Sequence, residues 1–323
     1  MVTYAIGLVI LGLVLLVVGG EALLRGAVGM ATLLKLTPAI IGLTVVAAGT
    51  SIPEMAVSVL AAMDNKADIS VGNVVGSNIF NIAFIIGLCA IFMPIPILGN
   101  TIKLEYPVLA IVTLLCLALA QDGEINRLDA ILMMVMYIAF TAYLVSLVRQ
   151  QVSASEAAAL TEEVKDISAN EKKPAWWSSG LLVLVGVLLL AGGAQSTVSG
   201  AVELARLMGW SERIIGLTIV SIGTSLPEVV ASAVSLYRGR ADVSVGNVIG
   251  SNLFNILMIL GISGFITPLP VQPAIMNSDC YWMLGITLLL FPIIFTGRRI
   301  SQLEGFILLG CYGVYLTLLI RSA

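Results

Sequence analysis

The chain has 323 residues, of which 59% are hydrophobic and only 11% are charged, and its mean hydropathy is +1.06. Soluble domains carry about twice that share of charge, so the composition excludes an ordinary soluble fold. The net charge of −3 comes with no basic stripe that could neutralise phosphates, which argues against nucleic acid as a partner, and the absence of histidine excludes a histidine metal site or proton relay.

Long apolar blocks along the chain predict an all-α polytopic membrane protein surrounded by the lipid bilayer. The first half is predicted to contain five transmembrane helices, at 4–33, 37–62, 69–94, 104–121 and 127–148. The second half is predicted to contain five more, at 178–206, 212–236, 243–268, 281–297 and 302–320. Residues 150–176 are polar and of mixed charge, which is typical of a linker.

A shift of 174 residues aligns the second half with the first. Residues 42–82 and 216–256 are identical at 23 of 41 positions without a gap, which identifies an internal repeat. Because each half holds an odd number of predicted spans, the second copy enters the membrane from the opposite side. The sequence therefore predicts two inverted five-helix repeats, 1–149 and 177–323, an arrangement typical of transporters.

The distribution of lysine and arginine predicts the orientation in the membrane. The loops on the side of the N-terminus hold five of these residues, and the loops on the other side hold eleven. Cytoplasmic loops carry the excess of positive charge. Both termini are therefore expected outside and the 150–176 linker in the cytoplasm, and we expect a prokaryotic inner or plasma membrane as the location.

The motif GTSIPE at 49–54 recurs as GTSLPE at 223–228. Pro53 and Pro227 remove a helical hydrogen bond near the middle of a predicted span, which is tolerated only against protein or a wet cavity. Glu54 and Glu228 follow directly, and a charged residue at the centre of a span costs at least about 2.5 kcal/mol. A bent structural helix is the plain alternative, but a duplicated proline and glutamate favour a functional site.

The second repeated motif is GNVVGSNIFN at 72–81, which recurs as GNVIGSNLFN at 246–255. Its polar residues lie at helical spacing on one face, and its glycines allow close approach of another helix. A packing seam would explain the glycines alone. Next to GTSxPE, the polar face is predicted to complete an oxygen-lined site with amide and hydroxyl groups from Asn81, Asn255, Ser77 and Ser251.

Inversion is expected to bring the two copies together near the membrane midplane. The site would offer two carboxylates, amide oxygens, hydroxyls and carbonyls, without sulfur or imidazole ligands. Such hard donors suit Ca²⁺ or Na⁺ and suit Zn²⁺ or Cu⁺ poorly. Because two carboxylates neutralise one Ca²⁺ or two Na⁺, mutual exclusion at one site is a physical basis for exchange. No nucleophile or metal triad indicates an enzyme, and no cofactor or protein partner is expected.

These motifs resemble the two alpha repeats of the sodium/calcium exchangers, in the cation/calcium antiporter superfamily. The resemblance implies alternating access that couples sodium entry to calcium extrusion, with the first and sixth spans sliding across the rest. It implies that calcium lies between Glu54 and Glu228, with Thr50 and Thr224 contributing. It also implies sodium sites lined by Ser51, Ser225, Ser77, Ser251 and the carbonyls near Ala47 and Ser221.

The stoichiometry and the identity of the counter-ion both stay open at this stage. Some members of that family carry aspartate where this chain has Asn81 or Asn255, so stoichiometry and potassium dependence do not transfer. Exchange of H⁺ for Ca²⁺, with Glu54 and Glu228 as proton acceptors, is the closest rival to sodium exchange, and exchange of another monovalent or divalent cation is the broader form of this alternative. The hydroxyl-rich surroundings favour sodium modestly, because protons need no oxygen cage.

Overall fold

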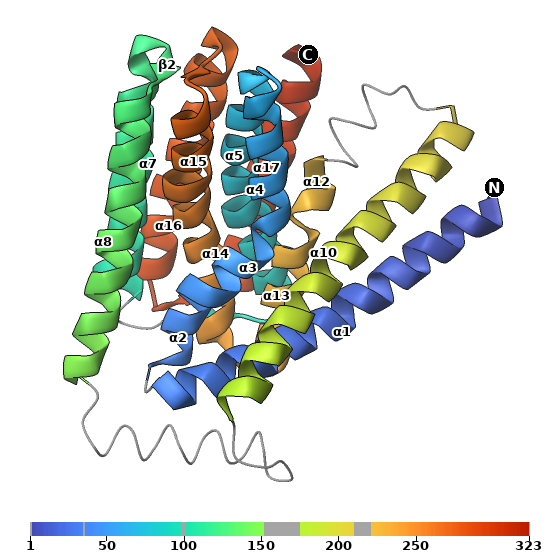
Figure 1. Ribbon diagram of the computed structural model, residues 1–323, viewed down its shortest axis with the longest axis vertical. Helices are drawn as coiled ribbons and strands as arrows, with labels where there is room; N and C mark the ends of the chain where they lie inside the picture. The colour runs from blue at the N-terminus through green and yellow to red at the C-terminus, as the bar shows by residue number, and fades with distance from the viewer. Residues whose placement is uncertain (1, 35, 98–100, 152–174, 210–220, 323) are drawn as a thin grey trace.

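The computed structural model describes residues 2–34, 36–97, 101–151, 175–209 and 221–322 (Figure 1). The predicted linker lies largely outside these residues, as does the start of the span predicted at 212–236. The helices and short strands of the first half are α1 (Val2–Leu34), α2 (Pro38–Ile41), the π-helix η1 (Gly42–Val46), α3 (Ala47–Thr50), α4 (Ile52–Met63), α5 (Ala67–Ile79), the π-helix η2 (Phe80–Ile86), α6 (Gly87–Phe92), β1 (Ile95–Pro96), the π-helix η3 (Thr101–Glu105), α7 (Tyr106–Leu119), η4 (Ala120–Asp122), β2 (Glu124–Ile125) and α8 (Arg127–Gln151).

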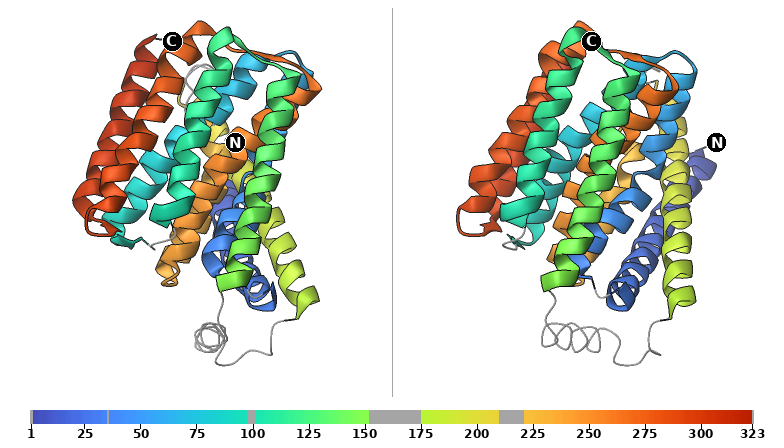
Figure 2. Two further views of the ribbon diagram at one scale, coloured as in Figure 1. Left: turned by 90° about the vertical axis from the view of Figure 1, so that its left-hand side faces the viewer. Right: turned by 60° about the vertical axis from the view of Figure 1, so that its left-hand side comes forward.

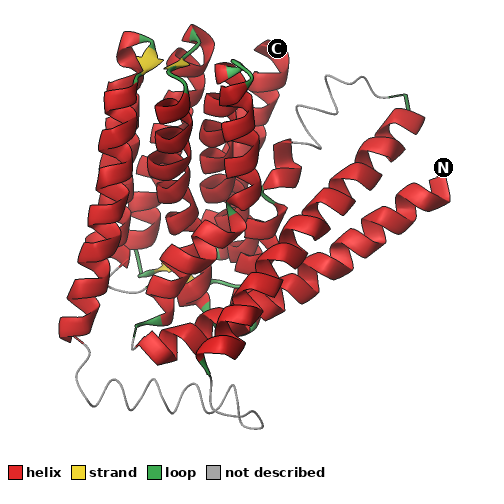
Figure 3. Cartoon of the chain, in the orientation of Figure 1, coloured by secondary structure: helices red, strands yellow, loops and turns green. Residues whose placement is uncertain are grey.

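The second half follows the same order. Its described elements are α10 (Trp176–Leu207), α12 (Ser221–Thr224), α13 (Leu226–Tyr237), α14 (Ala241–Phe254), the π-helix η6 (Asn255–Ile259), α15 (Leu260–Ile266), β3 (Leu269–Pro270), the π-helix η7 (Ile275–Asp279), α16 (Cys280–Phe295), β4 (Arg299–Ile300) and α17 (Gln302–Ser322). Figure 3 shows how completely helices make up the chain.

Eight helices among the described residues are long and apolar enough to cross a membrane. A ninth span results if α2 to α3 and α4 are counted together, since they are bent by 48° at a short break. The shorter apolar helix α13 is the equivalent of α4 in the second half. The protein is thus an α-helical membrane protein, as its composition predicts.

Four short strands were not predicted, and they join the two halves. β1 pairs antiparallel with β4, and β2 pairs antiparallel with β3. Each pair links a strand of the first half with one of the second half, at opposite ends of the helix bundle (Figure 3). Hydrogen bonding between these strands satisfies backbone groups at the ends of helices that are otherwise joined by short connections.

Helices α1 and α10 lie side by side and cross the rest of the molecule at an angle (Figures 1 and 2). They run in opposite directions, because α1 descends from the N-terminus in Figure 1 whereas α10 ascends from the linker. They have 33 and 32 residues, longer than the roughly 20 that a bilayer requires. A tilt accommodates this extra length. The spans predicted at 4–33 and 178–206 are likewise the longest of the ten predicted from the sequence.

Glycines at every seventh position form the contact between α1 and α10. The two sets are related by the same shift of 174, and they are Gly12, Gly19, Gly26, Gly186, Gly193 and Gly200. A Cβ atom on Gly193 would lie 2.8 Å from the backbone nitrogen of Leu16 and 2.9 Å from the backbone oxygen of Gly12. The two backbones therefore approach as closely as small residues permit.

We expect Gly193→Ala to destabilise the protein by about 1–3 kcal/mol, because the added methyl group meets backbone atoms that cannot rotate away. Gly192→Ala, one residue earlier, is the matched control, since a Cβ there meets no atom of the described residues within 4 Å. The measurement is the thermal midpoint of both variants in detergent. Equal midpoints for the two variants would contradict this description of the contact.

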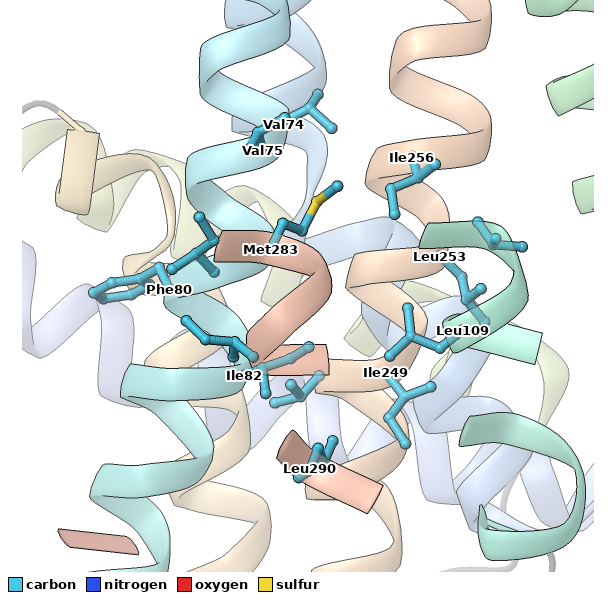
Figure 4. Packing of buried hydrophobic residues seen from close by; sticks show 14 of the residues in the cluster. Val74, Val75, Phe80, Ile82, Leu109, Ile249, Leu253, Ile256, Met283 and Leu290 are labelled. Carbon is cyan, nitrogen blue, oxygen red and sulfur yellow. The ribbon is translucent and has the colours of Figure 1, made fainter. Parts of the chain in front are cut away.

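The remaining helices form a bundle around a large apolar core. Figure 4 shows part of it, where Val74 and Val75 of α5 and Ile249 and Leu253 of α14 pack with side chains from α7 and α16. The outer faces of α1, α8, α10 and α17 remain exposed and apolar, as expected for surfaces in contact with lipid. The two central helices α5 and α14 are therefore enclosed, and they carry the second repeated motif.

Candidate ion-binding site

Both GTSxPE motifs form a break between two helical segments. Ser51 separates α3 from α4 with φ −82° and ψ 10°, and Ser225 separates α12 from α13 with φ −89° and ψ 6°. These angles lie in the sparsely populated bridge region, where many functional residues are found. Pro53 and Pro227 fall in the first turn of the following helix, where a missing N–H costs nothing. The prolines thus start a second helix inside the span.

The same geometry places a carboxylate at each new helix start. Glu54 lies in the first turn of α4, and Glu228 lies in the first turn of α13. The positive end of a helix dipole favours negative charge at this position. Both side chains are 1% exposed, so water does not compensate their charge. The two carboxylates are also close enough to interact with each other electrostatically.

Each motif serine bonds to the glutamate of the other repeat. The hydroxyl of Ser51 donates to Glu228 Oε1 at 2.8 Å, and the hydroxyl of Ser225 donates to Glu54 Oε1 at 2.9 Å. The second oxygen of each carboxylate, Oε2, has no hydrogen-bond partner among the described residues. Because an unpaired buried charge is costly, these two carboxylate oxygens are candidate ligands for a cation.

The other predicted hydroxyls gather around these two carboxylates. Thr224 and Ser225 lie beside Glu54, and Thr50 and Ser251 lie beside Glu228. The Ser225 hydroxyl is also 3.5 Å from that of Ser77, across the two repeats. The Ser251 hydroxyl is buried and makes no hydrogen bond within the described part of the chain.

The two predicted asparagine ligands are buried but bond to neither glutamate in the described ranges. Asn81 lies in η2 and donates its Nδ2 to Asn252 Oδ1 at 3.0 Å, which leaves its Oδ1 without a described partner. Asn255 begins η6, and neither side-chain atom has a partner among the described residues. π-helical turns inside longer helices are frequent at functional sites, and here both repeats have one at the same place.

The predicted carbonyl ligands differ between the repeats. The Ala47 carbonyl accepts the backbone N–H of Ser51 at 3.1 Å and the Thr50 hydroxyl at 3.3 Å. In the second repeat the Ser225 N–H bonds instead to Ile222 at 3.2 Å, one residue beyond the equivalent Ser221. A cation at Ala47 would therefore displace the Thr50 hydroxyl bond, since hydroxyls rotate freely to suit their partners.

Four further polar residues support the glutamates, and two of them are serines whose role sequence reasoning missed. Asn73 Nδ2 donates to the Glu54 backbone oxygen at 3.2 Å and to Ser58 at 3.0 Å. Asn247 Nδ2 makes the equivalent bonds to the Glu228 backbone oxygen at 3.5 Å and to Ser232 at 3.0 Å. Ser58 and Ser232 are themselves related by the shift of 174, which was the available signal.

This arrangement can hold a hard cation through oxygen atoms. Two carboxylates provide a charge of −2, and hydroxyl, amide and carbonyl oxygens surround them, which suits Ca²⁺. In the described ranges, no three histidine, cysteine or acidic side chains are arranged so that they could hold a metal ion together. Since two negative charges are present, one Ca²⁺ would neutralise the site, whereas a softer metal would lack its preferred ligands.

We expect Ser51→Ala and Ser225→Ala each to reduce calcium transport by about ten-fold or more. Each loses a hydrogen bond to a buried carboxylate, a contact worth about 1.5–3 kcal/mol. Thr113→Val is the control, because that hydroxyl donates to the carbonyl of Leu109 on its own helix, far from both glutamates in the sequence. The measurement is the initial rate of calcium uptake into proteoliposomes. Calcium uptake by Ser51→Ala and Ser225→Ala at the same rate as by Thr113→Val would contradict a role for the serines.

The sodium/calcium exchanger protein family matches residues 4–146 and 178–321, which is nearly the whole chain. The chain belongs to the sodium/calcium exchanger family. The two matched segments correspond to the two halves that the internal repeat defines. As a member of this family, the protein is an integral membrane antiporter that exchanges a cation for Ca²⁺.

Relatives of this exchanger cover its full length. "Putative antiporter CaxA" of Alkalimonas amylolytica is 40% identical over 97% of this chain and 98% of its own length. "Sodium/calcium exchanger MaX1" of Methanosarcina acetivorans is 31% identical over 99% of both chains. Among solved structures, the sodium-calcium exchanger NCX_Mj soaked with zero Na⁺ and Ca²⁺ has a TM-score of 0.83, with 28% identity over 99% of this chain and all of that chain.

Proposed function

We propose that this exchanger moves Ca²⁺ across the membrane in exchange for Na⁺, by alternating access to one oxygen-lined site near the membrane midplane. The observation that carries the proposal is the pair of buried carboxylates at Glu54 and Glu228, each with one oxygen free of described partners. One Ca²⁺ or two Na⁺ would neutralise the same pair, so the two ions exclude each other.

The ligands in this proposal come from both repeats equally. Glu54 and Glu228 provide charge, and the remaining ligands are Thr50, Thr224, Ser51, Ser225, Ser77, Ser251, Asn81, Asn255 and the carbonyls of Ala47 and Ser221. The crossed serine bonds support a shared site, because each carboxylate is held by the opposite repeat. A site built in this way is sensitive to any movement of one repeat relative to the other.

The proposed architecture is ten transmembrane helices in two inverted repeats, 1–149 and 177–323. The opposite directions of α1 and α10 support the inversion (Figure 1). Both termini would lie outside and the 150–176 linker in the cytoplasm, as the positive charges of the loops indicate. A prokaryotic inner membrane is supported by a 31% identical relative from Escherichia coli, which is named the inner membrane protein YrbG.

Exchange of H⁺ for Ca²⁺ is the second candidate, and it is favoured by the unbonded carboxylate oxygens, which could each accept a proton. Sodium is preferred because hydroxyl groups crowd both carboxylates, and proton transfer does not require them. Sodium transport is also named for the relative from Methanosarcina acetivorans.

Purified protein in proteoliposomes distinguishes the two candidates. Vesicles loaded with Na⁺ or with choline are diluted into radiolabelled Ca²⁺, each with and without a pH gradient. We expect calcium uptake to require internal Na⁺ and to be unchanged by the pH gradient when an ionophore clamps the membrane potential. Uptake that follows the proton gradient and ignores Na⁺ would instead support the second candidate.

A further inference from the structure

Four buried asparagines connect the two repeats beside the candidate site. Asn78 and Asn81 follow each other by three residues in the first repeat, and the shift of 174 relates them to Asn252 and Asn255. All four are 1% exposed. Asn81 Nδ2 donates to Asn252 Oδ1 at 3.0 Å, and Asn252 Nδ2 donates to the backbone oxygen of Asn78 at 3.2 Å.

The equivalent bond on the other side is broken. By the same shift, the counterpart of the bond from Asn81 to Asn252 would run from Asn255 Nδ2 to Asn78 Oδ1. Both of these atoms are buried and lack a hydrogen-bond partner among the described residues. One donor and one acceptor that would satisfy each other are thus left apart in an interior where such groups are normally bonded.

Met283 on α16 accepts a hydrogen bond from the side-chain amide of Asn78. Asn78 Nδ2 donates to Met283 Sδ at 3.7 Å instead of to the backbone oxygen of Asn252, which the shift of 174 would make its acceptor. The residue equivalent to Met283 in the first repeat is Leu109, which has no acceptor atom. Figure 4 shows Met283 close to Val74 and Val75, and Leu109 in the corresponding place beside Ile249. The sulfur acceptor is therefore present on one side only.

We propose that Asn78 and Asn252 are positioning residues whose hydrogen bonds alternate with the access state. In the present state Asn252 fixes the amide of Asn81, so that Asn81 Oδ1 is left available as a ligand. In the opposite state Asn78 fixes the amide of Asn255 in the same way, and the bond between Asn81 and Asn252 opens. Met283 stabilises the present state by holding Asn78.

The inference rests on the proposed alternating access between inverted repeats. When such repeats exchange conformations, a contact made on one side of the two-fold axis is remade on the other. The unpaired Asn255 Nδ2 and Asn78 Oδ1 then destabilise the present state, and in the opposite state they bond to each other. A bistable element of this kind is what two-state coupling requires.

Calcium self-exchange, which needs no sodium and no proton gradient, tests the alternation. Vesicles that hold the exchanger in either orientation give the apparent Ca²⁺ affinity at each membrane face. The ratio of these two affinities reports how the two access states are populated. Asn252→Ser removes the bond of the present state. Asn78→Ser removes the amide bond of the opposite state, and in the present state it removes only the weaker bond to the Met283 sulfur. We expect the two variants to shift the ratio in opposite directions, by roughly two- to ten-fold each, since one neutral hydrogen bond changes.

Met283→Leu provides a variant with conserved volume that keeps the fold. It is expected to shift the ratio in the same direction as Asn252→Ser, because it also weakens the present state. If Asn78→Ser and Asn252→Ser shift the ratio in the same direction, or Met283→Leu leaves it unchanged while self-exchange continues, the alternation is wrong and the asparagines form a static seam. Absence of calcium self-exchange in the wild type would overturn the proposed function itself, and the alternation with it.

Discussion

Glu54→Gln and Glu228→Gln are each expected to reduce calcium transport by about 100-fold or more. Glutamine keeps the shape of the side chain but removes half of the negative charge of the site. A contact with a charged group is worth up to about 3 kcal/mol, and each 1.4 kcal/mol is a factor of ten. The measurement is sodium-driven uptake of radiolabelled Ca²⁺ into proteoliposomes, at several calcium concentrations.

Stability separates this result from simple misfolding. Removing a buried, incompletely paired charge relieves a desolvation cost, so both variants should melt at the same temperature as the wild type or higher when calcium is absent. Glu105→Gln is the matched control, because Glu105 is also a buried carboxylate but bonds to Thr101 on its own helix at 2.8 Å. Transport near the wild-type rate in Glu54→Gln or Glu228→Gln would remove the proposed site.

Gly250→Ala is expected to have the second large effect, on both folding and transport. A Cβ atom on Gly250 of α14 would lie 2.7 Å from the backbone carbon and Cα of Leu43 in η1. Backbone atoms cannot move aside as side chains do, so the helices must separate, at roughly 1–3 kcal/mol or more. That separation would also break the 3.3 Å bond between Thr50 and Asn247.

The thermal midpoint and the calcium uptake rate of Gly250→Ala are compared with those of Gly285→Ala. Gly285 lies inside α16, and a Cβ there meets no atom of the described residues within 4 Å. We expect Gly285→Ala to match the wild type, while Gly250→Ala melts earlier and transports less. Similar behaviour of the two variants would show that the approach of α14 to η1 is not needed.

Much of the site could be predicted from the sequence because one chain contains both copies of the repeat. The duplicated proline and glutamate reveal the carboxylates, and helical spacing reveals that Ser77 and Asn81 lie on one face of their helix. A repeat also states which residues are equivalent, such as Ser51 and Ser225. It does not state which copy contacts which, so the crossed bonds from each serine to the opposite glutamate required the folded chain.

Other features left no readable pattern. The two-residue strands β1 to β4 are too short for a period-two alternation to be detected. The bonds of Asn252 and Asn78 depend on helix rotation within π-helical turns, which hydrophobic periodicity does not report. The glycine contact of α1 and α10 was detectable as a seven-residue spacing, but its closeness depends on the distance between two backbones.

Equilibrium binding of radiolabelled Ca²⁺ to the purified protein tests most directly whether Glu54 and Glu228 form one site. Binding is measured in detergent at increasing NaCl, with choline chloride keeping the ionic strength constant. We predict one Ca²⁺ per chain, displaced by Na⁺ but not by choline, and lost in Glu54→Gln and in Glu228→Gln alike. Calcium binding that survives in either variant, or that Na⁺ does not displace, would contradict a shared site.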